Sequence, residues 1–360
     1  MDIKHRKIWQ QACGDTDRNY SEVCLEWDVI LNGPGYAGAY PEGDETLKQH
    51  GWKSKKRTDI RRFAFQMAEG DIVVLRLGTA DVLGVGEIVG KYEWNNIFGD
   101  IDGWDLQHVR RVRWLWKQEE SPKKFNTYDL KQGDTTQELT SEAVRKWLEE
   151  LDIPEEKYKS EIKQLPAESK EVEYPEIAEY LYEQGVSSHS IETLIKEFDE
   201  LRRIAKWYQY KEAPSEFETV AYLVIPILRA LGWTPQKMAI EWRKVDLALF
   251  DQLPRHDSSL AIVVEAKKKG NSCLTAKSQA QGYAEGKKNC KRLIVTDGLR
   301  YGCYIKEENK YRLYAYMNLI DLKADYPIYE CFGVKEALRS MTPEWKPEII
   351  KPEIQTDENE

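Results

Sequence analysis

Two carboxylates and a lysine in the second half of the chain form a pattern that can act on a phosphodiester. Asp246 precedes the run Glu265-Ala266-Lys267, which follows the apolar stretch Leu260–Val264. Carboxylate oxygens are ligands for Mg²⁺, and a bound Mg²⁺ beside an ammonium group neutralises phosphoryl oxygens and supplies a deprotonated water. The pattern predicts metal-dependent hydrolysis of a phosphodiester, with Mg²⁺ as the cofactor and Mn²⁺ as its substitute.

These three residues also have a structural interpretation. Asp246 can be a solvent-facing acid of a strand, and Glu265 with Lys267 can be a surface ion pair at a strand end. The chain passes abruptly from an apolar strand into Lys267-Lys268-Lys269-Gly270. That change favours an edge that faces a substrate.

The surrounding sequence predicts the elements that position these groups. Alternating apolar and polar residues mark a strand at 245–250, in which Asp246 is the first polar position. Gln279 and Tyr283 lie one helical turn apart, on a helix between two buried strands. In chain order we expect an apolar helix over Val220–Leu231, strands at 238–242, 245–250 and 260–264, the Gln279 helix, and a strand at 292–296. That order indicates a mixed α/β core.

Residues 214–304 resemble the nuclease core of the PD-(D/E)XK superfamily, most closely the nuclease at the N-terminus of type I restriction motor subunits. Besides Asp246 and Glu265-Ala266-Lys267, the resemblance rests on Glu218 (with Glu216 as the second choice), Ile240-Glu241, Gln279-Ala280, Tyr283-Ala284 and Thr296-Asp297-Gly298. It implies that Asp246 and Glu265 bind the metal with help from Glu218. It also implies that Lys267 aligns water or phosphate, and that Gln279 and Tyr283 support the site and the DNA.

Several of these residues keep an alternative role. Ser215-Glu216-Phe217-Glu218 fits a capping box, in which Glu218 bonds back to the Ser215 amide. Glu241 can be an outer ligand of the metal or an ordinary strand residue. Gln279 and Tyr283 can belong to the helix surface and core.

The N-terminal region has a different texture, with short β-like segments and many glycines. Strands are expected at 71–77, 82–89 and 109–115, and a small barrel closes such strands without exposed edges. The region resembles the PUA-like superfamily, particularly EVE-type domains, in Arg61-Arg62, Gly70-Asp71, the Gly84-Val-Gly86-Glu-Ile-Val strand and Val112-Arg-Trp-Leu115. The resemblance implies an aromatic pocket that accepts a flipped, often methylated base.

The candidates for that pocket surround two loops. Glycines let a backbone approach a base closely, aromatic rings stack on it, and Asn or Asp reads its polar edge. A single tryptophan can equally be part of a core, so we expect only some of the candidates to line a pocket. The candidates are Trp27, Asn32, Tyr36, Tyr40, Trp94, Asp102 and Trp104.

Composition leaves nucleic acid open as a partner. The net charge of the 360 residues is −9, but local basic clusters can carry phosphate contacts. The six cysteines and five histidines show no metal-binding spacing, so neither a zinc site nor a disulfide framework is indicated. No signal peptide or membrane-length apolar run is visible, which predicts a cytoplasmic protein. The basic clusters are Lys53–Arg57 with Arg61-Arg62, Arg110-Arg111 with Arg113, and Lys267–Lys269 with Lys277, Lys287, Lys288, Lys291 and Arg292.

The predicted fold class is α+β with several domains. We expect a PUA-like barrel at 1–118, a helical connector at 119–212, a mixed α/β PD-(D/E)XK core at 213–342 and a disordered tail at 343–360. The helix from Ile191 to Tyr208 carries an apolar stripe that must be buried. Its partner is the nuclease domain, a helix at 175–184, or the same helix of a second copy in a homodimer.

The sequence as a whole predicts a modification-dependent endonuclease of the type IV restriction kind. Its partner would be DNA that carries 5-methylcytosine, hydroxymethylcytosine or N6-methyladenine, and no membrane. No P-loop motif is present, so cutting is expected to need only metal. The alternatives are a nuclease that acts on RNA and a non-catalytic nucleic-acid-binding protein.

Overall fold

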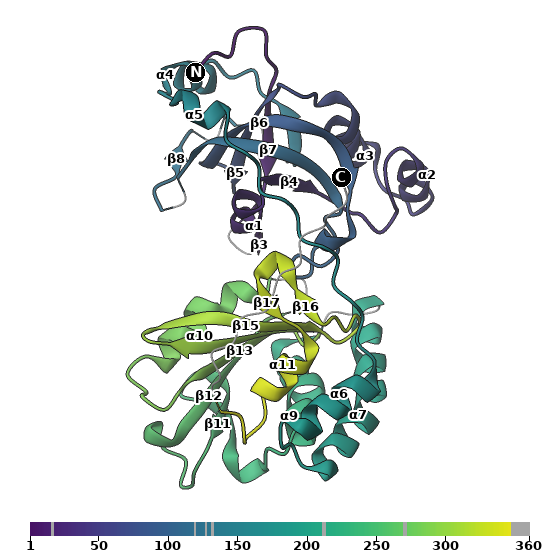
Figure 1. The fold of residues 1–360 in the computed structure, drawn as a ribbon, viewed down its shortest axis with the longest axis vertical. Coiled ribbons are helices and arrows are strands. Elements are labelled where there is room, and N and C mark those ends of the chain that lie inside the picture. The colour runs from purple at the N-terminus through teal and green to yellow at the C-terminus, as the bar shows by residue number, and fades with distance from the viewer. Residues whose placement is uncertain are drawn as a thin grey trace. The chain divides into compact units, whose positions relative to one another are not determined.

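The computed structural model describes residues 1–346 except 16–17, 119, 127, 131–132, 211–213 and 269–271. The chain folds into two compact units, one comprising Met1–Pro166 and the other beginning at Ala167 (Figure 1). Each unit combines helices with its own large sheet, which confirms the mixed α and β character expected from the sequence.

The first unit is built on a seven-stranded sheet with the order β4-β7-β6-β5-β1-β9, and β8 pairs with β6. Its strands are β1 (Ile8–Ala12), β4 (Val29–Asn32), β5 (Ile72–Leu77), β6 (Asp81–Trp94), β7 (His108–Lys117), β8 (Lys123–Lys124) and β9 (Thr136–Glu138), with a separate pair β2 (Gly14–Asp15) and β3 (Arg18–Asn19). Its helices are α1 (Ser21–Glu26), α2 (Glu42–Gln49), α3 (Ser54–Arg61), α4 (Glu142–Glu150) and α5 (Glu155–Tyr158), with short turns η1 (Arg62–Gln66) and η2 (Asn96–Phe98). The three strands expected from the sequence correspond to β5, β6 and β7.

The seven-stranded sheet is curled (Figure 1), and polar side chains link the strands at its two ends. Asn32 at the end of β4 donates from Nδ2 to Thr136 Oγ1 of β9 over 3.0 Å. Gln11 of β1 donates to the Leu31 carbonyl oxygen of β4 over 2.6 Å, and its Oε1 accepts from Thr136 Oγ1 over 2.6 Å. Because these groups are buried, their mutual hydrogen bonds satisfy atoms that no strand partner reaches.

The second unit is built on an eight-stranded sheet with the order β10-β11-β12-β13-β14-β15-β17-β16. Its strands are β10 (Met238–Trp242), β11 (Val245–Phe250), β12 (Leu260–Ala266), β13 (Arg292–Thr296), β14 (Arg300–Glu307), β15 (Lys310–Asn318), β16 (Asp325–Tyr326) and β17 (Cys331–Phe332). Its helices are α6 (Tyr174–Glu183), α7 (Ser188–Tyr210), α8 (Glu216–Thr219), η3 (Val220–Val224), α9 (Ile225–Ala230), α10 (Lys277–Ala284) and α11 (Val334–Ser340), with short turns η4 (Pro235–Lys237), η5 (Asp257–Ser259), η6 (Leu274–Ala276) and η7 (Pro327–Tyr329). The helix and strands predicted around Asp246 occupy the expected order.

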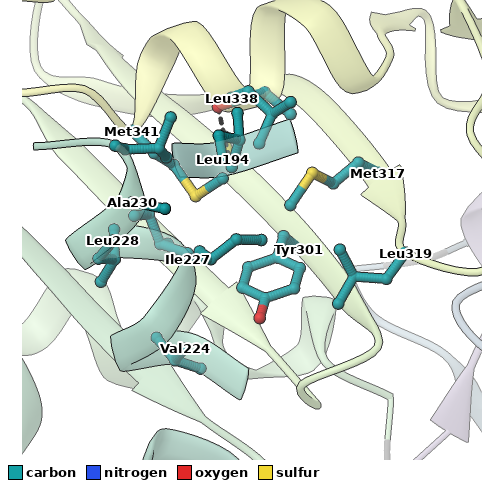
Figure 2. Packing of buried hydrophobic residues seen from close by; sticks show 14 of the residues in the cluster. Leu194, Val224, Ile227, Leu228, Ala230, Tyr301, Met317, Leu319, Leu338 and Met341 are labelled. Atoms are coloured by element: carbon teal, nitrogen blue, oxygen red, sulfur yellow. Dashed lines mark hydrogen bonds between the residues drawn. The ribbon is translucent and has the colours of Figure 1, made fainter. Parts of the chain in front are cut away.

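Alternation along the strands gives this sheet two buried faces. Leu247 and Leu249 of β11 belong to one apolar cluster, whereas Ala248 and Phe250 belong to the other. Figure 2 shows the first cluster, in which side chains of α7, α9 and α11 meet those of β14 and β15. The second cluster includes Ala280 and Ala284 of α10. The side chains of Asp246, Ala248 and Phe250 therefore lie on the face of the sheet that α10 covers.

The segment expected as a helical connector is divided between the two units. Helices α4 and α5 belong to the first unit, and α6 and α7 belong to the second. On α7 the apolar stripe is buried, with Leu194 and Phe198 each at 0% exposure, among residues of α6 and α9. Of the partners considered from the sequence, the stripe is thus covered by its own unit, and it offers no free apolar face to a second copy.

The C-terminal segment is ordered further than expected. Trp345, placed in a disordered tail by the sequence analysis, is buried with its ring 6.4 Å from that of Tyr314 and 5.1 Å from the Arg292 guanidinium. The Trp345 ring packs into the core, although the prolines around it predicted disorder. The rest of the predicted tail, residues 347–360, lies outside the described residues. Within the part of the chain that the structure describes, no helix is long and apolar enough to cross a membrane.

Candidate active site

Asp246 and Glu265 are neighbours in the second sheet, on the side where β11 begins and β12 ends. Leu247 of β11 pairs with Val264 of β12, and the strands are antiparallel, so Asp246 stands opposite Glu265. The Ala266 amide donates to Asp246 Oδ2 over 2.7 Å, which fixes that carboxylate against β12. Both carboxylates share the face that α10 covers.

Lys267, Gln279 and Tyr283 are linked to Glu265 through a chain of hydrogen bonds. Lys267 Nζ donates to Glu265 Oε1 over 3.0 Å and to Gln279 Oε1 over 2.8 Å. Gln279 Nε2 donates in turn to Tyr283 OH over 3.2 Å. The structure therefore brings together five of the six side chains that the sequence predicts at one site, and Glu218 is the sixth.

Burial makes both carboxylates hard to ionise. Glu265 is 2% exposed, and its burial raises the pKa of the carboxyl to about 7 despite the bond from Lys267. Burial also raises the pKa of Asp246, against the bond from the Ala266 amide, and the negative charges of Glu216 and Glu241 act in the same direction. A pair of carboxylates in this state gains from any cation that enters between them.

The residues present fit a divalent metal ion. Among the described residues, no hydrogen-bond donor reaches the buried Glu265 Oε2. A lone pair that lies buried without a donor is stabilised by a coordinated cation. No group of three His, Cys, Asp or Glu side chains gathers at this place or elsewhere in the described ranges. Mg²⁺ commonly binds through one or two carboxylates and keeps several waters, so Asp246 and Glu265 are sufficient as protein ligands.

The structure places the two helix acids differently from the sequence ranking. Glu218 accepts from the Ser215 amide over 2.8 Å and from Ser215 Oγ over 2.9 Å, and these bonds lower the pKa of Glu218. It thus performs the capping role that was its structural alternative. Glu216 is the helix acid whose charge acts on both Asp246 and Glu265. The family pattern had ranked it second.

Glu241 lies across the hairpin from Asp246 in a left-handed backbone conformation. Ile240 pairs with Leu247 and Trp242 with Val245, which leaves Glu241 and Asp246 opposite each other between these pairs. The φ angle of Glu241 is 56°, a region that a side chain with a Cβ rarely adopts. The strand therefore carries backbone strain next to the carboxylate site.

Replacing Glu241 by glycine is expected to raise the free energy of unfolding by about 0.5–1 kcal/mol. The left-handed conformation costs an L-residue about 1–2 kcal/mol, and the extra freedom of glycine in the unfolded chain offsets about half of that. Urea unfolding at pH 8 measures the change. Glu241→Gln is the control, because it removes the charge and keeps the strain. A glycine variant less stable than this control would contradict the expectation.

In the first unit, four candidate pocket residues lie near one end of β4, β6 and β7. His108 pairs with both Asn32 and Trp94 in the sheet register. Tyr92 OH lies 2.8 Å from His108 Nδ1 and accepts from the Tyr40 amide over 2.9 Å. Tyr36 is 53% exposed and also belongs to the loop after β4.

That loop is fastened by residues that the sequence analysis did not single out. Asp105 Oδ2 accepts from the Tyr36 amide over 2.6 Å, and His108 Nε2 lies 3.0 Å from the Pro34 carbonyl oxygen. Burial raises the pKa of Asp105 and lowers that of His108, which favours a neutral imidazole. The available signal was the polar residues Asp105, Gln107 and His108 at the start of the strand β7.

The remaining candidates occupy other surroundings. Trp27 is 2% exposed, and Lys163 Nζ lies 3.8 Å from the centre of its ring. The segment around Lys163 is itself tied to the unit, because its amide donates to Asp28 and its carbonyl accepts from Arg111. Trp104 stacks with the Arg18 guanidinium at 3.9 Å, and Asp102 is buried at 8% exposure.

Most of the basic clusters noted in the sequence have partners inside the units. Arg57 pairs with Asp44, and Arg62 and Lys55 both pair with Asp134. Other members bond backbone carbonyls, as Arg110, Arg111, Arg113, Lys287 and Arg292 do. A run of like charges in the sequence does not reveal which of them the fold neutralises. Lys267 is the member that the structure places in the carboxylate cluster.

Comparison with known families gives one match. A model described as a domain of unknown function, DUF8426, matches residues 9–140, which lie in the first unit. No curated protein matches the chain.

Proposed function

We propose that this chain is a metal-dependent endonuclease that cuts DNA near a modified base. The observation that carries the proposal is the cluster of Asp246, Glu265, Lys267 and Gln279 at one sheet edge, joined by bonds of 2.8–3.0 Å between Lys267 and its two partners. A PD-(D/E)XK core, inferred from the sequence resemblance, would place these residues at its catalytic edge.

Asp246 and Glu265 would hold the metal ion, with the charge of Glu216 close by. Bound Mg²⁺, or Mn²⁺ in its place, supplies charge neutralisation at the phosphate and a water of lowered pKa. Asp246 is fixed for this task by the Ala266 amide, and Glu265 directs Oε1 to Lys267 while Oε2 remains available.

Lys267 would orient the attacked phosphate or the water. An ammonium group has three N–H donors, and the bonds to Glu265 and Gln279 use two of them. The third can point to a phosphoryl oxygen. Tyr283 keeps Gln279 in place, which restricts the Lys267 side chain to one position.

The first unit would read the modified base as a PUA-like, EVE-type domain. Support comes from its curled sheet and from the fastened loop after β4, which carries the exposed Tyr36 and, further on, Tyr40. Asn32 and Trp27 would act as supports, since both side chains are buried. The proposed bases are 5-methylcytosine, hydroxymethylcytosine and N6-methyladenine, and the proposed setting is restriction of foreign DNA in the cytoplasm.

The test is cleavage of one plasmid prepared unmodified, cytosine-methylated, hydroxymethylated and adenine-methylated. We expect Mg²⁺-dependent cutting of one modified form and none with the Asp246→Ala variant. Equal cutting of all forms would remove the reader role and keep the nuclease. Cutting of structured RNA alone would replace DNA by RNA as the substrate. Binding without any cutting would leave a non-catalytic nucleic-acid-binding protein.

A further inference from the structure

The hairpin between β10 and β11 has an unusual turn next to the carboxylate site. Trp242 pairs with Val245, so Arg243 and Lys244 form a two-residue turn. Their φ angles are 51° and 75°. Positive φ at both central residues defines the type I′ turn, which strongly favours Asn-Gly. Two long basic residues therefore occupy positions where each of them is strained.

The two side chains of this turn have different surroundings. Arg243 pairs with Asp257 over 2.6 Å and lies 5.5 Å from the Trp242 ring centre. Lys244 is exposed, and no hydrogen bond or ion pair with another described residue involves its ammonium group. Arg243 therefore makes stabilising contacts within the unit, whereas the Lys244 ammonium group makes none with the described residues.

The turn lies at the same sheet edge as Asp246 and Glu265. β11 begins at Val245, and its Leu247 pairs with Val264 near the end of β12. Lys244 is two residues before Asp246, so their Cα atoms are at most about 7 Å apart. A ligand whose phosphate reached Asp246 would bring its neighbouring negative charges to this turn.

We propose that Lys244 contacts the phosphodiester backbone of the nucleic acid beside the phosphate that is cut. The inference rests on the proposed function and assigns a substrate-binding residue to that same site. A strained turn that holds an exposed cation two residues from Asp246 suits the binding of an anionic ligand at this site. Since the contact is to the backbone, it is independent of sequence and of base modification.

The test compares the salt dependence of binding for Lys244→Gly and the wild-type full-length chain. Fluorescence anisotropy with a labelled modified duplex, its unmodified copy and an RNA hairpin is measured in metal-free buffer from low to moderate NaCl. Loss of one phosphate contact reduces the slope of log K against log salt by about 0.9 for duplex DNA. We expect that reduction with both duplexes, together with binding roughly threefold to tenfold weaker at low salt.

Two further variants serve as controls. Lys244→Arg keeps the charge and should match the wild type. Lys310→Gln removes a lysine from the β14–β15 hairpin, which lies at the opposite sheet edge because β14 runs antiparallel to β13, and should leave the slope unchanged. Glycine suits the turn, so the Lys244→Gly variant should unfold at the wild-type temperature or above it.

The outcomes separate this inference from the function on which it rests. A Lys244→Gly slope equal to that of the wild type overturns the backbone contact, even when Mg²⁺-dependent cutting that Asp246→Ala abolishes shows the nuclease to be present. An equal loss of slope in Lys310→Gln also overturns it, because the effect would then be one of overall charge. A wild-type protein that binds none of the three probes overturns both the contact and the proposed function.

Discussion

Replacing Glu265 by glutamine is expected to abolish metal-dependent cleavage while it makes the metal-free protein more stable at pH 8. Cleavage should fall by at least about 10³-fold, because the loss of a metal ligand removes several kcal/mol of transition-state stabilisation. The gain in stability has a separate cause. Glutamine keeps the shape of the side chain and removes the buried negative charge.

The pH dependence of that gain follows from the raised pKa of Glu265. An unfolded glutamate releases its proton near pH 4.5, whereas the folded Glu265 keeps its proton until about pH 7. Over that interval the unfolded wild type binds fewer protons than the folded form, so its stability falls as the pH rises. The glutamine variant does not titrate there. Its advantage, roughly 1–3 kcal/mol, should be fully present above pH 7 and absent below about pH 4.5.

Urea unfolding at several pH values and plasmid cleavage at saturating Mg²⁺ measure the two effects. Addition of Mg²⁺ should stabilise the wild type and leave the glutamine variant unchanged, because only a form that binds the metal gains from it. Glu307→Gln, at the opposite edge of the sheet, is the matched control. A glutamine variant that cuts at more than a tenth of the wild-type rate would remove Glu265 from the catalytic site.

Replacing Phe198 by alanine is expected to lower the free energy of unfolding of the second unit by about 3–5 kcal/mol. Phe198 is 0% exposed in the core between α7, α6 and α9, and its ring lies 5.4 Å from that of Tyr174. Removal of a buried phenyl group loses its transfer free energy and leaves a cavity that rigid neighbours do not fill.

Urea unfolding of the intact chain, followed by circular dichroism, measures this loss. Glu192→Ala on the exposed face of the same helix is the control and should change stability by less than about 0.5 kcal/mol. A dimerisation helix would respond differently. In that case Phe198→Ala would lower the molecular mass in sedimentation at little loss of monomer stability, and such a result would contradict the packing of α7 within its own unit.

The sequence predicted the elements around the carboxylates well because their signals are local. The strand that starts at Val245 has Asp246 as its one polar residue, and the strand that leads to Glu265 is apolar up to that residue, so their identity and order required no knowledge of distant contacts. Helix spacing placed Gln279 and Tyr283 on one face, and the structure joins them to Lys267.

Other features depend on contacts that exist only in the folded chain. Ser215 and Glu218 satisfy each other locally, and this leaves Glu216 as the acid whose charge reaches the site. The apolar stripe of α7 predicted burial, but the sequence pattern is the same whether the stripe packs within its own unit or against a second copy. Likewise, Arg110 and Arg292 are basic in sequence and yet buried against backbone carbonyls.

The segment around Lys163 determines where the first unit can be cut from the rest of the chain. It covers Trp27 and bonds Asp28, Arg111 and Arg113 through residues 160–163. A fragment that stopped at residue 140, where the family match ends, would expose the Trp27 indole and remove the Lys163 and Ser160 carbonyl oxygens to which Arg111 and Arg113 donate. An isolated first unit should therefore extend to Pro166. Proteolysis that removes residues 160–163 is expected to destabilise that unit.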